Sequence, residues 1–403
     1  MPASPSSPSL SLQAASDAVP STGPLSVVES ISLLQALSSV PDPRKRRGRR
    51  HGLQSILLLA LTAVNAGARS WVAIADWARF GDHGVWVCGR PPEASTFRRV
   101  LTAVDVAALE TALATWIGGR RDHAMAAGRV SGRPEPAAEG RQVIAVDGKT
   151  VRGARTPEGT QTQLFAAYDH RHGLILTQTA IVGGDEVAAF ATTLNTLPEL
   201  HGVLITADAL HTQRGHADYL HARGAHYLCT VKGNQPRLRA ALARLPWSQA
   251  PRQVARGRGH GRTESRSVTV IAADGKPDLG GLFPHAAQAL RIIRRRKDNR
   301  TGRRSVEVVY ALTSLTHRQA NPGLLAAWLQ GHWGIENRVH HVRDVTQGED
   351  ASRIRTGNGP RVMAVLRNTA LNLARLGGQP NIAQAQRRAS WSSGEGLRDI
   401  TAA

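Results

Sequence analysis

The segment Val143-Ile144-Ala145-Val146-Asp147-Gly148-Lys149 joins a β-branched apolar run to an acid and a glycine. Such a run predicts a short buried strand over Gln142–Asp147. Further out along the chain, similar runs predict strands at Gln163–Asp169, Leu174–Val182, Val203–Asp208 and Ala225–Val231, and helical patterns occur at Val187–Leu197 and Gln213–Arg223. Three strands, a helix, a strand, a helix and a strand in this order predict an α/β fold, in which a mixed sheet carries helices on its faces.

A tail and a helical region precede the predicted sheet. Residues 1–26 are rich in Ser, Pro and Ala without periodicity, so we expect a disordered tail. Residues 27–128 contain helical patterns at Ile31–Leu37, Leu53–Asn65 and Trp71–Phe80, and Ser95 is a candidate N-cap for a further helix. Short helices together with a basic segment predict a helical N-terminal DNA-binding domain.

An insertion divides the predicted α/β core. The first part of the core spans residues 129–235. Residues 236–315 are rich in Arg and Gly and contain strand-like runs at Ser267–Ala272, Ala289–Ile293 and Val306–Leu312, which predicts a β-rich insertion. Residues 316–378 return to the core with a helix that starts at Asn321–Pro322 and a second helix at Pro360–Leu376. We expect residues 379–403 to be a C-terminal tail.

The charge of the chain points to a polyanionic partner. It has 51 Lys and Arg against 30 Asp and Glu, a net charge of +21. Nucleic acid and an acidic membrane surface both fit such a charge, and the excess of Arg favours the bidentate phosphate contacts of nucleic acid. The longest apolar run, Ile56–Val64, is far shorter than the roughly 20 residues that span a bilayer, so we interpret it as a core helix. Cys88 and Cys229 are too few for a disulfide framework and fit a reducing cytosol.

Three acids could form one site. Asp147 and Asp208 follow separate predicted strands, and open α/β sheets place ligands at the carboxyl ends of their strands. Glu336, on the helix that starts at Asn321–Pro322, could close the cluster. Carboxylates this close repel one another unless a cation lies between them, and hard oxygen ligands suit Mg²⁺. Two such ions about 4 Å apart can support phosphodiester chemistry.

Each acid also has a simpler interpretation when it is taken singly. Asp147 could begin an Asp-Gly turn, which is common after strands. Asp208 could be the N-cap of the following helix, and Glu336 could be a solvated helix residue. The combination of the three favours the metal site.

The helix that carries Glu336 presents further titratable groups. In an α-helix His332, Glu336, His340 and Arg343 lie on one stripe, which places cationic groups beside the acid and within reach of DNA phosphates. A polar face with an i,i+4 Glu–His pair explains the spacing equally well. A zinc site of His332, Glu336 and His340 is a weaker alternative, because no water-activating base or outer ligand accompanies it.

The chain resembles bacterial insertion-sequence DDE transposases of the ISAs type, also called H-repeat-associated proteins, over roughly Leu33 to Leu376. The motifs that carry the resemblance are Asp42-Pro43-Arg44, Asp147-Gly148-Lys149-Thr150, Asp208-Ala209-Leu210-His211-Thr212-Gln213, Lys232-Gly233-Asn234-Gln235, His332-Trp333-Gly334-Ile335-Glu336-Asn337, and Asp344-Val345 with Glu349-Asp350-Ala351-Ser352. The resemblance implies an RNase H-like core with Asp147, Asp208 and Glu336 as catalytic metal ligands. It also implies a β-rich insertion before the glutamate helix.

This chain departs from the pattern of related transposases at four positions. These often carry Tyr and Arg seven and four residues before the glutamate, and Lys seven residues after it. Leu329, His332 and Arg343 stand there instead, so only the last position keeps a charge. The aromatic residue expected beside His340 is replaced by His341.

Basic and polar residues near these motifs are candidate DNA contacts. The first cluster, Arg44–Arg50, precedes a predicted helix, and the segment Arg291–Arg304 is strongly basic. Such runs are often only solvated segments, but beside a nuclease site phosphate contact is favoured. The candidate DNA-binding residues are Arg44, Lys45, Arg46, Arg47, Arg49, Arg50, Lys232, Asn234, Arg294, Arg295, Arg296, His332, His340 and Arg343.

The sequence and the resemblance together predict a Mg²⁺-dependent transposase. It would use two Mg²⁺ ions, for which Mn²⁺ substitutes, and would bind the inverted repeats at the ends of its element and then target DNA. We expect double-stranded DNA as partner, no membrane, a homodimer or larger synaptic assembly, and a cytoplasmic, nucleoid-associated protein. A stand-alone RNase H-like nuclease and a non-catalytic DNA-binding relic are the alternatives.

Overall fold

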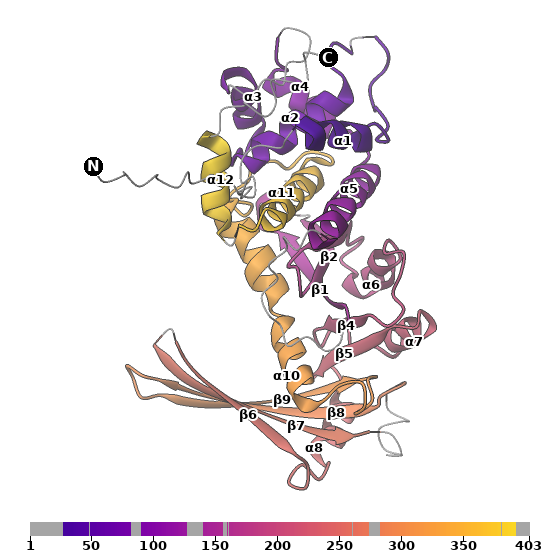
Figure 1. Cartoon of the computed structure of the whole chain (residues 1–403), viewed down its shortest axis with the longest axis vertical. Helices are drawn as coiled ribbons and strands as arrows, with labels where there is room; N and C mark the ends of the chain where they lie inside the picture. The colour runs from indigo at the N-terminus through magenta and orange to yellow at the C-terminus, as the bar shows by residue number, and fades with distance from the viewer. Residues whose placement is uncertain are drawn as a thin grey trace, which may run out of the picture.

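The computed structural model describes residues 27–47, 49–81, 90–126, 140–155, 159, 161–259, 261–273, 283–379 and 381–391 (Figure 1). The predicted tail at residues 1–26 and Cys88 lie outside this part of the chain. The second predicted tail, residues 379–403, contains a helix, α12 (Ile382–Trp391). Cys229 is buried and is not in a disulfide.

Five helices form the N-terminal region at one end of the molecule (Figure 1). They are α1 (Val27–Leu37), α2 (Leu53–Asn65), α3 (Trp71–Phe80), α4 (Ala94–Leu101) and α5 (Val106–Ala126). The bounds predicted for α2 and α3 are confirmed. The N-cap predicted at Ser95 is wrong, because α4 begins earlier and its N-cap is Glu93. The sequence analysis missed α5, whose apolar residues do not form the single stripe on which such a prediction depends.

The N-terminal helices share a core with a helix near the other end of the chain. The predicted helix at Pro360–Leu376 is α11 (Gly359–Leu376), and its buried side chains Met363 and Leu366 belong to the same apolar cluster as Leu57 and Phe97. Helix α11 packs against α2, α4 and α5. The segment Ile56–Val64 is fully buried within α2, which confirms its interpretation as a core helix.

Within the described residues, no single helix has the length and apolar character needed to cross a membrane. One bent pair, Ala94–Leu101 with Val106–Asp122, meets the criterion by length and composition alone.

One sheet of nine strands runs through the rest of the molecule, in the order β3-β2-β1-β4-β5-β9-β8-β7-β6. Strands β1 and β4 and strands β4 and β5 are parallel, and the other neighbouring pairs are antiparallel. The strands are β1 (Val143–Val151), β2 (Thr162–Asp169), β3 (Ile175–Ala180), β4 (Leu204–Ala207), β5 (His226–Val231), β6 (Arg252–Gly259), β7 (Arg262–Ala272), β8 (Gln288–Asp298) and β9 (Arg304–Thr313). The mixed α/β fold is therefore confirmed.

The predicted insertion continues the core sheet. Strand β9 pairs with β5 at Val231↔Tyr310, and β8, β7 and β6 follow it outward. Figure 1 shows these four strands reaching away from the helices as a long ribbon. The sequence analysis missed β6, because its residues Arg252–Gly259 are all exposed and rich in Arg and Gly.

Helices cover both faces of the sheet. On one face, α6 (Glu186–Leu194), α7 (Arg214–Ala222) and α8 (Pro236–Ala243) bury Phe190, Leu220 and Leu238 against it. On the other face lie α10 (Pro322–Gly331), the helical run after it, and α11. A short 3₁₀ turn, Arg152–Ala154, follows β1. The second face carries Glu336.

Candidate active site

Asp147 and Asp208 stand at matching positions on neighbouring parallel strands. Ala145 of β1 is paired with Thr206 of β4, and each acid lies two residues further along its own chain. Strand β4 ends at Ala207, whereas β1 continues to Val151 through its pairing with β2. The prediction that Asp147 ends its strand is therefore wrong. Antiparallel pairing with β2 holds the Asp-Gly pair extended, where an isolated Asp-Gly would favour a turn.

The loop that carries Asp208 is tied down by hydrogen bonds. Asp208 Oδ1 accepts the Leu210 N–H at 2.8 Å. Asn234 Nδ2 donates to the Ala209 carbonyl at 2.5 Å, and Gln235 Nε2 donates to the Thr212 carbonyl at 2.9 Å. Asn234, predicted as a DNA contact, therefore has its amide engaged with this loop. Asp208 is not the N-cap of α7, since Gln213 occupies that position.

The Glu336 helix changes its geometry at the site. It begins as predicted, because Asn321 Oδ1 accepts the Leu324 N–H at 3.0 Å and Pro322 stands in the first turn. After α10, however, the segments Glu336–His340 and Val342–Thr346 are π-helical. The His341 N–H bonds to the Glu336 carbonyl, five residues back. Such wide turns are rare and frequently occur at functional sites.

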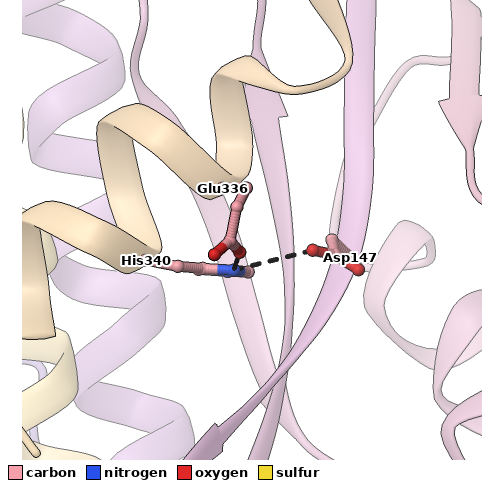
Figure 2. Close-up of side chains that lie close together, drawn as sticks. All are labelled: Asp147, Glu336 and His340. Atoms are coloured by element: carbon pink, nitrogen blue, oxygen red, sulfur yellow. Dashed lines mark hydrogen bonds and ion pairs between the residues drawn. The ribbon is translucent and has the colours of Figure 1, made fainter. Parts of the chain in front are cut away.

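The wide turns redirect the stripe that was predicted for an ideal α-helix. Glu336 and His340 remain neighbours at i,i+4, as Figure 2 shows. Arg343, one turn on, points into the protein and is fully buried. Gly334 lets the helix approach β2 closely, because a Cβ there would lie 3.0 Å from the Tyr168 ring.

The side chains of Asp147, Glu336 and His340 converge (Figure 2). His340 Nδ1 lies 3.0 Å from Glu336 Oε2 and 3.6 Å from Asp147 Oδ2. One ligand atom from each of the three residues lies within 4.8 Å of the others. Asp208 lines the same cavity as Asp147 and Glu336.

The carboxylates of the site influence one another. Burial raises the pKa of Asp147 to about 7, and the negative charges of Glu186, Asp208 and Glu336 add to this rise. The hydrogen bond from His340 lowers the pKa of Glu336. Burial lowers the pKa of His340, so its imidazole is neutral and donates to Glu336 without carrying a full charge. Asp147 therefore stands among acids that disfavour its ionised form, and His340 is its neighbour at 3.6 Å.

Glu186 is a residue that the sequence analysis missed. It is the first residue of α6, is half-buried, and Oε1 lies 3.1 Å from His211 Nε2. Its carboxylate packs over Gly148, where a Cβ would lie 2.3 Å from it, so a larger residue there would push the Glu186 side chain aside. The nearness of its charge to Asp147 makes it a fourth acid of the site. No spacing signal in the sequence distinguishes Glu186 from a helix-capping acid.

Lys149 fastens the Glu336 helix to β1. It stands two residues after Asp147 on the same face of the strand, and its Nζ lies 2.6 Å and 2.7 Å from the two carboxylate oxygens of Asp344. Asp344 belongs to the second π-helical segment. One face of β1 therefore carries Asp147 and, through Lys149, also holds the helical run that carries Glu336.

The structure does not support the DNA contacts predicted for Arg343 and His340, because it buries both side chains. Arg343 Nη2 donates to Glu349 Oε1 at 2.8 Å, and Arg367 Nη1 donates to the same oxygen at 3.0 Å. His332 is also turned inward, with Nδ1 3.1 Å from Thr206 Oγ1, and burial lowers its pKa to about 4. A neutral His332 lines the cavity but brings no positive charge to it.

A cavity of about 470 Å³ extends from the acids to the ribbon of β6–β9. Its far wall includes Lys232, Arg266, Arg294 and Arg296 together with Glu307. The three arginines form ion pairs with Glu264, and Arg294 also pairs with Glu307. Trp333, whose side chain is 52% exposed, lines it as well. Arg266 and Trp333 were not among the predicted site residues. The pairing of β7 with β8 brings Arg266 opposite Arg294, a contact that no local sequence pattern reveals.

The other predicted DNA contacts lie apart from the cavity. Arg44 is held inside its own loop, with Nη2 2.8 Å from both Asp42 Oδ2 and the His51 carbonyl. These bonds use the Nε and Nη2 groups of Arg44, and the phosphate contact predicted for this residue stays a prediction. The exposed members of this group are Lys45, Arg46, Arg47, Arg49, Arg50 and, on the ribbon, Arg295.

Residues 138–373 match the family described as "Transposase DDE domain", and residues 34–117 match a "DDE_Tnp_1-associated" domain. The chain is 29% identical to "Putative transposase YncI" of Escherichia coli O157:H7, over 85% of this chain and 87% of that protein. It is 26% identical to "H repeat-associated putative transposase YhhI" of Escherichia coli K12, over 86% and 91%. A solved piggyBac transposase synaptic complex with hairpin DNA has a TM-score of 0.39 at 11% identity, covering 95% of this chain and 79% of that one, a likeness too low to carry a conclusion.

The "Transposase DDE domain" match covers more than half of the chain and includes Asp147, Asp208 and Glu336. The relatives also agree with the resemblance drawn from the sequence motifs. The chain belongs to the DDE transposase family of bacterial insertion sequences.

Proposed function

We propose that this transposase binds the terminal inverted repeats of its own element, cleaves the phosphodiester bond at each end, and joins the freed 3′-hydroxyl to target DNA. The observation that carries the proposal is a single cavity with two unlike walls. Asp147, Asp208 and Glu336 form one wall and basic side chains of the ribbon form the other. Such a cavity can hold cations on one side and DNA phosphates on the other.

The order of the first five strands supports an RNase H-like core. Strands β3, β2 and β1 form an antiparallel meander, and β4 and β5 continue the sheet in parallel with β1. In this arrangement Asp147 and Asp208 come from adjacent central strands, and Glu336 comes from a helix packed on the same face. The catalytic roles of these three residues follow from that placement together with the family.

The donor set of the site suits divalent cations. Its acids carry oxygen ligands, and the carboxylates of Asp147, Asp208 and Glu336 line one cavity. Burial, with the charges of neighbouring acids, raises the pKa of Asp147, and a bound cation would oppose this rise. We assign Asp147, Asp208 and Glu336 as ligands of two Mg²⁺ ions, with Mn²⁺ as a substitute. When bound, the ions would activate a water molecule and then the 3′-hydroxyl for in-line attack at phosphorus and would stabilise the leaving oxygen.

The remaining residues of the cavity would position the DNA. Lys232, Arg294 and Arg296 line the same cavity as the acids. They would contact phosphates on either side of the cleaved bond, with the DNA replacing Glu264 and Glu307 as partners of the two arginines. The proposed partners are therefore the double-stranded element ends and the target DNA. Since two ends must be held together for joining, we propose that the protein acts as a homodimer or a larger assembly in the cytoplasm, at the nucleoid.

The variant Glu336→Gln tests this proposal. It keeps the size of the side chain and removes the charge that would hold a cation, so the protein should bind end DNA as the parent does and lose cleavage and joining together. Glu199→Gln is the matched control, because Glu199 is exposed and precedes β4 at the end of the sheet opposite Asp208. Gel-shift and end-cleavage assays would compare the two. Full cleavage by Glu336→Gln would contradict the assignment.

The two alternatives give different results in the same assays. A stand-alone nuclease would cleave end DNA but would not join the products to a second DNA. A non-catalytic relic would bind end DNA and cleave nothing in either Mg²⁺ or Mn²⁺. A joining assay on pre-cleaved ends separates a protein that lacks strand transfer from one that only fails at the first cut.

A further inference from the structure

His340 occupies an unusual place for a histidine of a carboxylate site. It is 3% exposed, and its Nδ1 faces the two acids Asp147 and Glu336 at the same time (Figure 2). A histidine that only supported one carboxylate would need a single such contact. The ring nitrogen of His340 instead lies where a third metal ligand would lie beside the two carboxylates.

The two distances from His340 Nδ1 to the acids fit a shared ion. Two ligands that each lie about 2.1 Å from an ion are roughly 3.0 Å apart at a right angle and about 3.4 Å apart at a tetrahedral angle. His340 Nδ1 lies 3.0 Å from Glu336 Oε2 and 3.6 Å from Asp147 Oδ2. An ion placed among the three atoms would replace the hydrogen bond between His340 and Glu336 with two bonds to the metal.

The fold holds His340 at this corner. Its ring is fixed by the π-helical segment Glu336–His340, and the following segment is fastened to β1 through Lys149 and Asp344. Among the described residues its Nε2 is buried without a hydrogen-bond partner. No contact at Nε2 therefore fixes which ring nitrogen of His340 carries the proton. Nδ1 can carry it and donate to Glu336, or can lose it and bind a metal.

We propose, on the basis of the proposed function, that His340 is a direct ligand of one of the two cations, which makes that site a mixed nitrogen and oxygen site. Imidazole is a ligand of first-row transition metals, and Mn²⁺ belongs to this series although it is its weakest binder, whereas Mg²⁺ is bound through oxygen. The site formed by Asp147, Glu336 and His340 therefore binds Mn²⁺ more tightly than Mg²⁺. Asp208 would complete the second, all-oxygen site on the other side of Asp147.

Pulsed electron paramagnetic resonance of Mn²⁺ bound to the full-length protein tests this without any turnover. A coordinated imidazole should give ¹⁴N modulation, and labelling the wild-type protein with ¹⁵N-histidine should change that modulation. This comparison uses no variant, so it does not depend on whether a substituted protein folds. Bound Mn²⁺ that shows no histidine nitrogen coupling would overturn the proposal.

The variant His340→Gln gives the second measurement. Titration calorimetry should show that Mn²⁺ affinity falls by roughly tenfold or more, because removing even a residue that only supports a metal ligand costs about tenfold in affinity. Mg²⁺ affinity should change less than threefold. His341→Gln is the control, because His341 is adjacent and exposed. Equal losses for both cations would show that His340 only orients Glu336, and the proposal would fail.

The outcomes separate this proposal from the proposed function. End cleavage in Mg²⁺, measured on the wild-type protein in parallel, reports the function alone. Cleavage in Mg²⁺ together with Mn²⁺ that has no nitrogen ligand would reject His340 and leave the transposase reaction in place. Absence of both cleavage and cation binding would reject the two together.

Discussion

Two charged clusters lie side by side in this protein and differ in how their charges are balanced. In one, Glu349 is fully buried between Arg343 and Arg367, and these cations hold the pKa of its carboxyl below the ordinary value despite burial. In the other, Asp147 faces further acids, and its pKa is raised to about 7. The first cluster pairs its buried acid with cations, whereas the second brings acids together, which is the arrangement expected of a cation site.

Removal of the unbalanced acid should have the largest effect. Asp147→Asn should reduce cleavage of end DNA on the order of a thousandfold or more, because a metal ligand contributes several kcal/mol to the transition state. The same change should not lower the free energy of unfolding near pH 7, because an acid whose pKa is raised by folding destabilises the folded state at that pH. Cleavage kinetics and urea denaturation of the same preparation measure both. Retained cleavage would remove Asp147 from the site.

The balanced cluster should respond in the opposite way. Glu349→Gln leaves Arg343 and Arg367 buried without an anion, so we expect a loss of about 3–5 kcal/mol in the free energy of unfolding. Metal binding by whatever protein remains folded should be little changed. Denaturant unfolding, with Glu199→Gln as the exposed control, checks this. A loss below about 1 kcal/mol would show that the cluster is not structurally important.

The sequence predicted the elements better than it predicted the side-chain environments. The strands around Asp147 and Asp208 and the Asn321 cap were recognised because local patterns determine them. The inward turn of Arg343 was not predicted, because it depends on a π-helical segment and on Glu349, and no heptad-like spacing encodes either. Arg343 and Glu336 are both charged residues on the same helical run, and only the fold distinguishes their roles.

The insertion provides a second example. Its strands β7, β8 and β9 were predicted, but the sequence gives no sign that β9 would pair with β5. That pairing joins the ribbon to the core sheet and brings Arg266, Arg294 and Arg296 across the cavity from the acids. Long-range pairing of strands depends on tertiary packing, so the basic wall could be seen only in the structure.

Trp333 lines the cavity that contains the acids and is a candidate contact for DNA bases. It is an exposed aromatic side chain on the helix of Glu336, and a nucleic-acid base can stack on such a face. Trp333→Ala should weaken binding to end DNA by about 1–3 kcal/mol, and Trp333→Phe should recover part of the loss. Fluorescence anisotropy with labelled end DNA measures both variants. Equal affinity for all three proteins would mean that the ring does not contact DNA.

The pH dependence of stability should reveal the unbalanced charge. The pKa of Asp147 is about 7 in the folded protein against an ordinary value of 3.8, so folding favours its protonated form. Without metal, the folded state should therefore lose stability as pH rises from about 4 to about 7, and Asp147→Asn should remove this component. Mg²⁺ or Mn²⁺ should raise the melting temperature most at pH 7 and above, where the carboxylate is ionised. Melting curves that shift equally with metal at pH 5 and pH 8 would contradict the prediction.

The basic loop before α2 offers the smallest and most direct test, because it contains both kinds of charge within three residues. Arg44 is paired with Asp42 and donates to the His51 carbonyl, whereas Arg46 is exposed. If exposed arginines contact phosphate, Arg46→Ala should reduce the slope of log K against log salt by about 0.9, the amount expected for one lost phosphate contact. Arg44→Ala should leave that slope unchanged and lower thermal stability instead, since it breaks a partly buried pair. DNA affinity measured at several salt concentrations, together with melting curves, distinguishes the two variants. A reduced slope for Arg44→Ala with unaltered stability would show that the pair opens to bind DNA, and the division between structural and DNA-binding charges would not hold in this loop.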